Sequence, residues 1–216
     1  MPPALDQEQA VEAARYALLR RLAYAMRHHM VVHLQPIGMI LEVMERRLEA
    51  PLPELGPIHE AMQKVNAHAR AAVQSSLDVV TWLAPEDGQL IAAEAGVREC
   101  FELLRSPLNF RGFALRNEAA ALPQPVSRSA IRSVLPAALL ALTDHGRSPA
   151  NLVMHGRWGA QRVEVVLTMQ ASEGTPGFSG EPHYRLIGWD DVQCIARAEG
   201  VGCLREGDTV TLSFAA

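Results

Sequence analysis

The amino-acid sequence predicts an α+β fold in which a long helical hairpin precedes an α/β sandwich. Three observations lead to this prediction: a helical repeat that runs almost unbroken over residues 6–49, a second helical repeat after a proline-rich turn, and alternating helix and strand periods beyond residue 88. At 216 residues with 49% apolar side chains, the chain is long enough to bury two cores. We therefore expect two domains, residues 1–84 and 88–216.

The first helix carries one apolar stripe with steps of three and four residues, the spacing of a core-facing helix. Its members are Leu19, Leu22, Met26, Met30, His33, Ile37, Ile40 and Met44. His28 lies two residues from both Met26 and Met30, about 200° around the helix at roughly 100° per residue, so it points away from the stripe. Pro36 removes one helical hydrogen bond and is expected to kink the helix.

The hairpin turn is predicted at residues 51–57, which read Pro-Leu-Pro-Glu-Leu-Gly-Pro. A second helical repeat follows, with apolar residues at Ile58, Met62, Val65, Ala69, Val73, Leu77 and Val80. The two helices form an antiparallel hairpin whose apolar faces are too extended to cover each other. Two hairpins paired in a dimeric four-helix bundle would bury these faces, so the sequence predicts a homodimer.

The second domain begins after a linker, Ala-Pro-Glu-Asp-Gly, at residues 84–88. Beyond it the sequence predicts helices near residues 97–105, 127–143 and 189–199, and strands near 113–117, 151–155, 162–168, 202–205 and 210–214. A Gly-, Pro- and Ser-rich loop is expected at residues 171–182. The expected architecture is a two-layer α/β sandwich with helices on one face of a mixed or antiparallel sheet.

Composition excludes several classes of protein. A net charge of −4 argues against nucleic acid as the main partner, and Lys64, the only lysine, does not follow the glycines of a Walker-type phosphate loop. Three cysteines without metal-ligand or redox spacing favour a reducing cytoplasm. The sequence shows neither an export signal nor an apolar run of the roughly 20 residues that a membrane span needs, so we expect a cytoplasmic protein without a membrane partner.

Residues 27–37, Arg-His-His-Met-Val-Val-His-Leu-Gln-Pro-Ile, resemble the phosphoacceptor motif of histidine kinases and of histidine phosphotransferases built on a kinase-like scaffold. The resemblance implies that His28 is the phosphoacceptor. Two positions depart from the motif, because His29 stands where an acidic residue is usual and Val32 where an asparagine or threonine is usual. A rival register, anchored on the Pro-Ile-Gly-Met-Ile-Leu run at residues 36–41, puts Val31 at the acceptor position and leaves no phosphohistidine.

The resemblance extends into the second domain, which is similar to the ATP-binding domain of histidine kinases. Residues 127–144 resemble the helix that carries the asparagine box, and residues 188–202 resemble the final glycine-box helix and strand. The nucleotide-binding residues are missing: the asparagine that would hold magnesium and phosphates falls at Asp144 or His145, and the adenine-reading Asp-x-Gly-x-Gly box falls at residues 171–175, Ala-Ser-Glu-Gly-Thr. An adenine amino group without its partner binds poorly, so we expect no ATP binding.

The resemblance thus implies a histidine phosphotransferase that relays a phosphoryl group between response-regulator receiver domains. His28 would be the catalytic residue, and the chain would need no cofactor of its own because the receiver would supply magnesium. The residues expected to bind the receiver are Arg27, Val31 and Gln35 on the first helix and Met62 and Asn66 on the second. Arg20, Arg21 and Arg27 form a helix edge that is expected either to join this face or simply to be solvated.

Three alternatives remain open at the level of sequence. The chain is either the phosphotransferase, a pseudokinase-like adaptor that binds a kinase or receiver without carrying phosphate, or a divergent ATP-dependent histidine kinase. The missing nucleotide ligands make the kinase the weakest of these. A metal site at His29 and His33, four residues apart, lacks a third ligand in the sequence pattern.

Overall fold

The computed structural model describes residues 4–84, 88–119, 121–178 and 184–216. The chain divides into two compact units, which we call the hairpin unit (residues 26–84) and the α/β unit (residues 1–25 together with 85–216). The predicted boundary near residue 84 therefore coincides with a unit boundary. The first 25 residues, which sequence analysis places in the hairpin domain, belong instead to the α/β unit.

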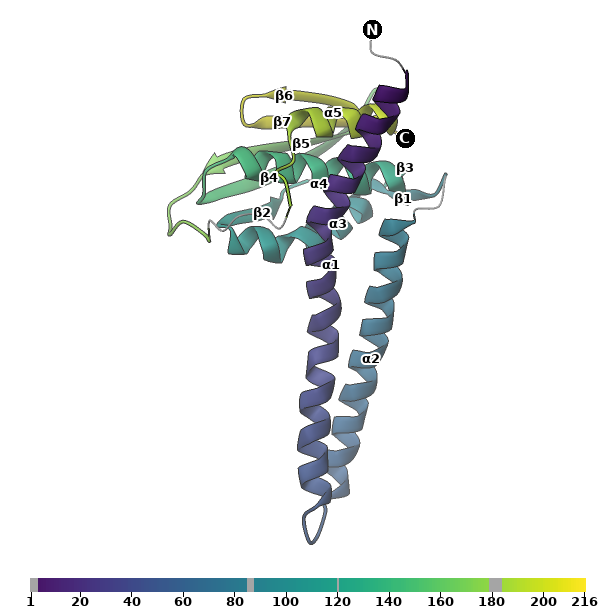
Figure 1. Cartoon of the computed structure of the whole chain (residues 1–216), viewed down its shortest axis with the longest axis vertical. Helices are drawn as coiled ribbons and strands as arrows, with labels where there is room; N and C mark the ends of the chain where they lie inside the picture. Colours follow the sequence, from purple (N-terminus) through teal and green to yellow (C-terminus); the bar gives the residue numbers. More distant parts are fainter. Residues whose placement is uncertain (1–3, 85–87, 120, 179–183) are drawn as a thin grey trace. The chain divides into compact units, whose positions relative to one another are not determined.

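Two antiparallel helices build the hairpin unit (Figure 1). Helix α1 (Ala4–Leu48) passes from the α/β unit into the hairpin, and helix α2 (Leu55–Leu83) returns. Helix α1 runs without interruption through Pro36, and its ends follow the helix dipole, with Asp6 in the first turn and arginines in the last. Both helices thus begin and end within a few residues of their predicted bounds.

The apolar surface of the hairpin is only partly covered within one chain. Met44, Ile58 and Ala72 are buried, whereas Val73 is 61% exposed and Leu77 56% exposed. An apolar groove of about 430 Å³ runs along the two helices, lined by Leu34, Ile37, Ala69, Ala72, Val73, Ser76, Leu77 and Val80. A single hairpin therefore leaves a long apolar face open, which is the premise of the predicted dimer; the dimer itself stays a prediction.

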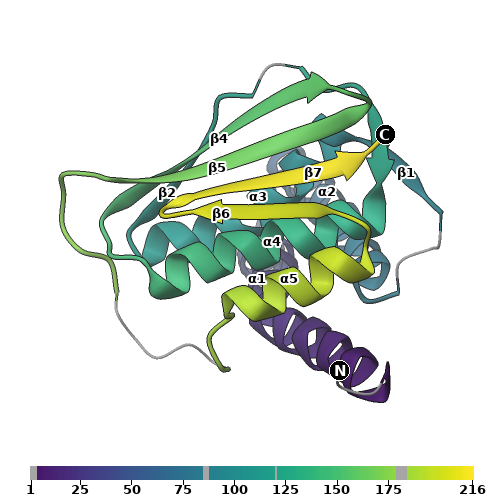
Figure 2. The same cartoon turned by 90° about the horizontal axis from the view of Figure 1, so that it is seen from above.

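A mixed five-stranded sheet forms one layer of the α/β unit (Figure 2). Its strand order is β2-β4-β5-β7-β6; β2 runs parallel to β4 and the other neighbours are antiparallel. The strands are β2 (Phe113–Asn117), β4 (Ala150–Gly159), β5 (Arg162–Ala171), β6 (Gly202–Glu206) and β7 (Thr209–Ala215). Every strand that the sequence predicts is present in this sheet.

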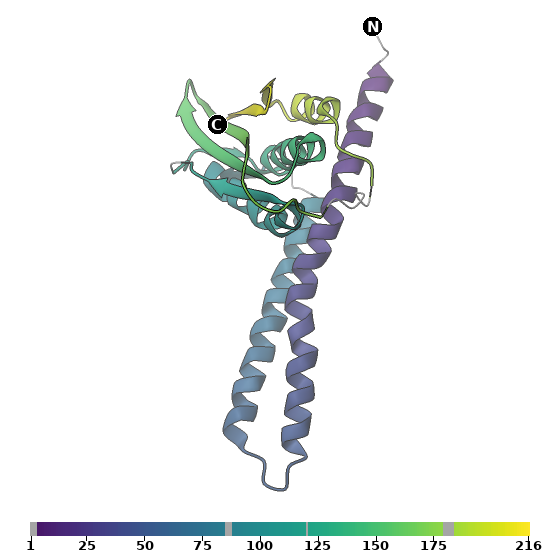
Figure 3. The ribbon, with the colours of Figure 1, turned by 90° about the vertical axis from the view of Figure 1, so that its left-hand side faces the viewer.

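Three helices cover one face of the sheet (Figure 3): α3 (Ala93–Phe110), α4 (Arg128–His145) and α5 (Trp189–Ala198). Alternate residues of the central strands point into this core, as period-2 burial along β5 and β7 shows. Helix α4 is buried on nearly all sides, and its buried residues include four Ala and four Leu. The expected two-layer sandwich is confirmed. None of the described helices combines the length and apolarity of a membrane span.

A small two-stranded ribbon was not predicted. Strand β1 (Leu90–Ala92) pairs antiparallel with β3 (Pro125–Ser127), which leads directly into α4. Ser127 then caps α4, because its Oγ accepts a hydrogen bond from the backbone N–H of Ala130 at 3.3 Å.

Candidate functional site

His28 lies on the exposed side of α1, as its place on the helical wheel predicts, while His29 and His33 are half-buried. An exposed imidazole on a regular helix is accessible to a second protein from the side. Among the residues that the structure describes, no third histidine, cysteine, aspartate or glutamate joins His29 and His33 in a metal-binding group.

The residues expected to bind a receiver are all exposed, but they fall into two groups. Arg27, Val31 and Gln35 lie four residues apart and form a line on α1 beside His28. Met62 and Asn66 lie on α2 nearer to the hairpin turn. His28 lies 20 residues before the end of α1 (48 − 28) and Met62 only seven after the start of α2 (62 − 55), so at about 1.5 Å per residue they are separated by roughly 20 Å along the hairpin.

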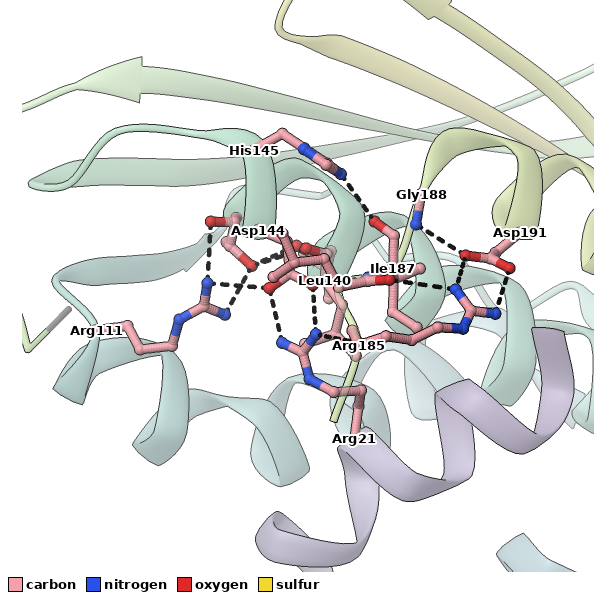
Figure 4. A network of polar contacts seen from close by, with 12 residues as sticks. Arg21, Arg111, Leu140, Asp144, His145, Arg185, Ile187, Gly188 and Asp191 are labelled. Carbon is pink, nitrogen blue, oxygen red and sulfur yellow. Dashed lines mark hydrogen bonds and ion pairs between the residues drawn. The ribbon is translucent and has the colours of Figure 1, made fainter. Parts of the chain in front are cut away.

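A second polar site lies in the α/β unit, around the carboxylate of Asp144 at the C-terminal end of α4 (Figure 4). Arg21 donates to both carboxylate oxygens, at 2.5 and 2.7 Å, and Arg111 contacts Oδ1 at 3.0 Å. The backbone N–H of Ile187 donates to Oδ2 at 2.9 Å. The Asp144 side chain is 0% exposed and that of Arg21 only 7%, so this is a buried ion pair with both carboxylate oxygens in use.

Further hydrogen bonds connect the segment 184–188 to helices α1 and α4. Arg21 Nη1 also donates to the carbonyl oxygen of Arg185 at 3.1 Å, and a ring nitrogen of His145 lies 3.2 Å from the carbonyl oxygen of Ile187. The guanidinium of Arg185 in turn binds Asp191 at 2.7 and 2.8 Å, as Figure 4 shows. The segment is thereby fixed at the end of α4 and the start of α5.

Sequence reasoning missed the partners of Asp144. Arg21 was expected on a helix edge that is solvated or meets a receiver, and this expectation is wrong, because Arg21 is buried against Asp144. A signal was present in the sequence: Arg21 lies three residues after Leu18 and four before Ala25, both of which are buried. Arginine in line with buried residues indicates an internal partner.

The residues at the Asp144 site do not fit magnesium and ATP. The resemblance to kinases puts the metal-holding asparagine at Asp144 or His145. Both oxygens of Asp144 already accept from Arg21, Arg111 and Ile187, and the carboxylate has no exposed surface. Two guanidinium groups within ion-pair distance would also repel a divalent cation. Binding of a metal–nucleotide complex here would require both arginines to leave.

Acid should weaken the anchoring of segment 184–188. A hydrogen bond from Arg185, opposed by burial and assisted by the Gly188 N–H, holds the pKa of the Asp191 carboxyl below its usual value of 3.8. A carboxyl with a lowered folded pKa contributes stability that is fully present above 3.8 and is lost as pH falls through its folded pKa. We expect the free energy of unfolding to fall below about pH 4 and Asp191→Asn to flatten that dependence. Urea unfolding at several pH values checks this; equal slopes in both proteins would contradict it.

Comparison with known proteins gives structural similarity only. No protein-family model and no curated protein sequence matches the chain. Among solved structures, it is similar to a histidine kinase from Burkholderia phymatum (15% identity, 90% of this chain and 96% of that one, TM-score 0.45) and to the catalytic domain of histidine kinase ThkA (14%, 58% and 92%, TM-score 0.45). A bacterial phosphotransferase matches with 15% identity over 99% of this chain and 98% of that one, at a TM-score of 0.39. Similarities at these identities and TM-scores do not establish a family.

Proposed function

We propose that this chain is a histidine phosphotransferase of two-component signalling, with His28 as the phosphoacceptor and without ATP binding. One observation carries the proposal: the histidine of the phosphoacceptor-like motif is exposed on a regular helix of a two-helix hairpin. The arrangement offers a nucleophile to a docking protein. The occupied Asp144 site is consistent with a phosphoryl group that comes from another protein.

The transfer chemistry requires little of this chain beyond a positioned nucleophile. A neutral ring nitrogen of His28 forms an N–P bond while the O–P bond of the receiver's aspartyl phosphate breaks, and the aspartate leaves as a carboxylate. The reverse reaction loads a second receiver. The receiver is expected to bring magnesium and a lysine that neutralise the transferring group, so this chain supplies orientation.

The proposed docking face extends from His28 toward the hairpin turn. Arg27, Val31 and Gln35 surround the acceptor on α1, and Met62 and Asn66 continue the face on α2, about 20 Å and 14 Å nearer the turn at 1.5 Å per residue. A face of this length is large enough for a standard protein–protein interface, which buries about 800 Å² on each partner. The apolar groove, in contrast, is assigned to a second copy of the hairpin in a homodimer.

The proposal predicts no measurable nucleotide binding. Because Asp144 is saturated by its own partners, isothermal titration with ATP in excess magnesium should give only the heat of dilution. The same titration with an active histidine kinase serves as a positive control. A dissociation constant in the micromolar range would contradict the prediction and favour the divergent kinase.

The experiment that tests the function is transfer of label from phosphorylated receivers. Candidate receivers, loaded with radioactive phosphate from a small-molecule donor and freed of that donor, are mixed with the wild-type chain. We expect label on this chain that is labile in acid and stable in base, the behaviour of phosphohistidine. Binding to a labelled receiver without acquisition of label would overturn the proposal in favour of an adaptor.

A further inference from the structure

Within the α/β unit, residues 4–25 of α1 contact the other elements at two levels through long-range side-chain pairs. In Figures 2 and 3 this part of α1 runs along the helical layer on the side away from the sheet. At the first level, Arg15 binds Glu199 at 2.8 Å, and the second carboxylate oxygen of Glu199 accepts from Ser129 of α4 at 3.0 Å. At the second level, six residues further along α1, Arg21 binds the buried Asp144.

An aromatic contact joins the segment 184–188 to the same stretch of α1. The rings of Tyr16 and Tyr184 meet edge to face with centroids 5.9 Å apart, and the guanidinium of Arg20 lies 5.3 Å from the centre of the Tyr184 ring. Arg21 also donates to the carbonyl of Arg185. Residues 4–25 of α1 therefore hold this segment by both polar and aromatic contacts.

The pair of Arg21 and Asp144 is the most deeply buried of these contacts, with side chains 7% and 0% exposed against 41% and 12% for Arg15 and Glu199. Breaking a buried pair by removing one partner costs far more than losing an exposed one, because the remaining charge stays desolvated. The negative C-terminal end of α4 strengthens the same attraction, and Arg111 adds a bond to the carbonyl oxygen of Thr143 at 3.1 Å.

We propose that Arg21 and Asp144 form a latch that closes residues 4–25 of α1 and the segment 184–188 over the C-terminal end of α4. The guanidinium of Arg21 serves as the permanent counter-cation of Asp144, at the position where the resemblance to kinases places a metal-holding residue. Opening the latch releases both segments together while the sheet and its helices stay folded. The latch does not depend on phosphoryl acceptance by His28, so the two proposals are tested separately.

Hydrogen–deuterium exchange on the full-length protein tests the latch. In Arg21→Met, which keeps an apolar stem but loses the charge, we expect exchange in residues 6–25 and 184–188 to accelerate about tenfold or more, with little change in β4, β5 and β7. Asp144→Asn should release the same two segments more strongly, because it leaves both Arg21 and Arg111 without the carboxylate. In the double variant, Arg21→Met with Asp144→Asn, the acceleration of exchange should be smaller than the two single accelerations combined, because the two residues form one contact.

Arg46→Met is the matched control, because Arg46 is an exposed arginine of the same helix and lies in its last turn. It should leave exchange in both segments at the wild-type rate. Unchanged exchange of residues 6–25 in Arg21→Met would overturn the proposal. Equal acceleration of exchange in β4, β5 and β7 would also overturn the proposal, because the pair would then stabilise the whole unit and not two local segments. Arg21→Met keeps the test decisive if Asp144→Asn fails to fold.

Discussion

His28→Gln should abolish phosphoryl acceptance from phosphorylated receivers. The lone pair of an amide nitrogen is delocalised into its carbonyl, so glutamine cannot form the N–P bond that an imidazole forms. The fold should survive, because His28 is exposed and glutamine suits a helix; we expect the free energy of unfolding to change by no more than about 0.5 kcal/mol. The measurement is label transferred at matched protein concentration, together with urea unfolding of both proteins.

His33→Gln is the matched control for the same substitution on the same helix. His33 is half-buried on the apolar stripe, so its replacement should cost more, about 1 kcal/mol, yet leave acceptance largely intact in the folded fraction. Equal labelling of wild type and His28→Gln would show that another residue is the acceptor. If the wild-type chain binds receivers but never takes label, the register with Val31 at the acceptor position is supported. The chain would then be an adaptor.

Most of the fold could be predicted because the repeats are long. The apolar stripe of the first helix persists from Leu19 to Met44, about seven turns, and the helix predicted at 6–49 spans Ala4–Leu48. Strand β5 shows a period of two, with Val163, Val165 and Leu167 buried, and this pattern can be read without tertiary information. In contrast, β1 and β3 have three residues each, too few to show a period, and they pair across more than thirty residues of sequence. Such pairing depends on the tertiary fold.

The difference between local and long-range information also explains which features of the candidate sites could be predicted from the sequence. The exposure of His28 follows from its angle to the stripe, a local property of one helix. The burial of Arg21 depends on Asp144, 123 residues away, and the spacing of Arg21 from Leu18 and Ala25 indicates an internal side chain without identifying its partner. The Arg21–Asp144 pair is one of several long-range contacts, with Arg15–Glu199 and Tyr16–Tyr184, that join the start of α1 to the α/β unit. Helical spacing is local information, so it cannot identify a partner that lies more than a hundred residues away.

Leu77→Glu should prevent dimerisation of the chain. Leu77 lines the apolar groove and is 56% exposed in one hairpin, so glutamate there is tolerated by a single chain. In the proposed four-helix bundle the same side chain would be covered by the second copy, and an unpaired carboxylate would be buried without compensation. We expect the dissociation constant of the dimer to rise by about a hundredfold or more, equivalent to roughly 3 kcal/mol. Sedimentation velocity between micromolar and tens of micromolar concentrations measures it.

Leu204→Glu separates this effect from a general response to added charge. Leu204 is 57% exposed, nearly the same as Leu77, but lies on β6 of the α/β unit. The two variants are matched in residue type, charge change and exposure, and they alter different surfaces, one on helix α2 and one on strand β6. Dimeric Leu204→Glu beside monomeric Leu77→Glu would place the second copy on the groove. The four-helix bundle would be refuted if the wild-type chain sedimented as a monomer at every concentration. It would also be refuted if Leu77→Glu and Leu204→Glu dimerised equally well.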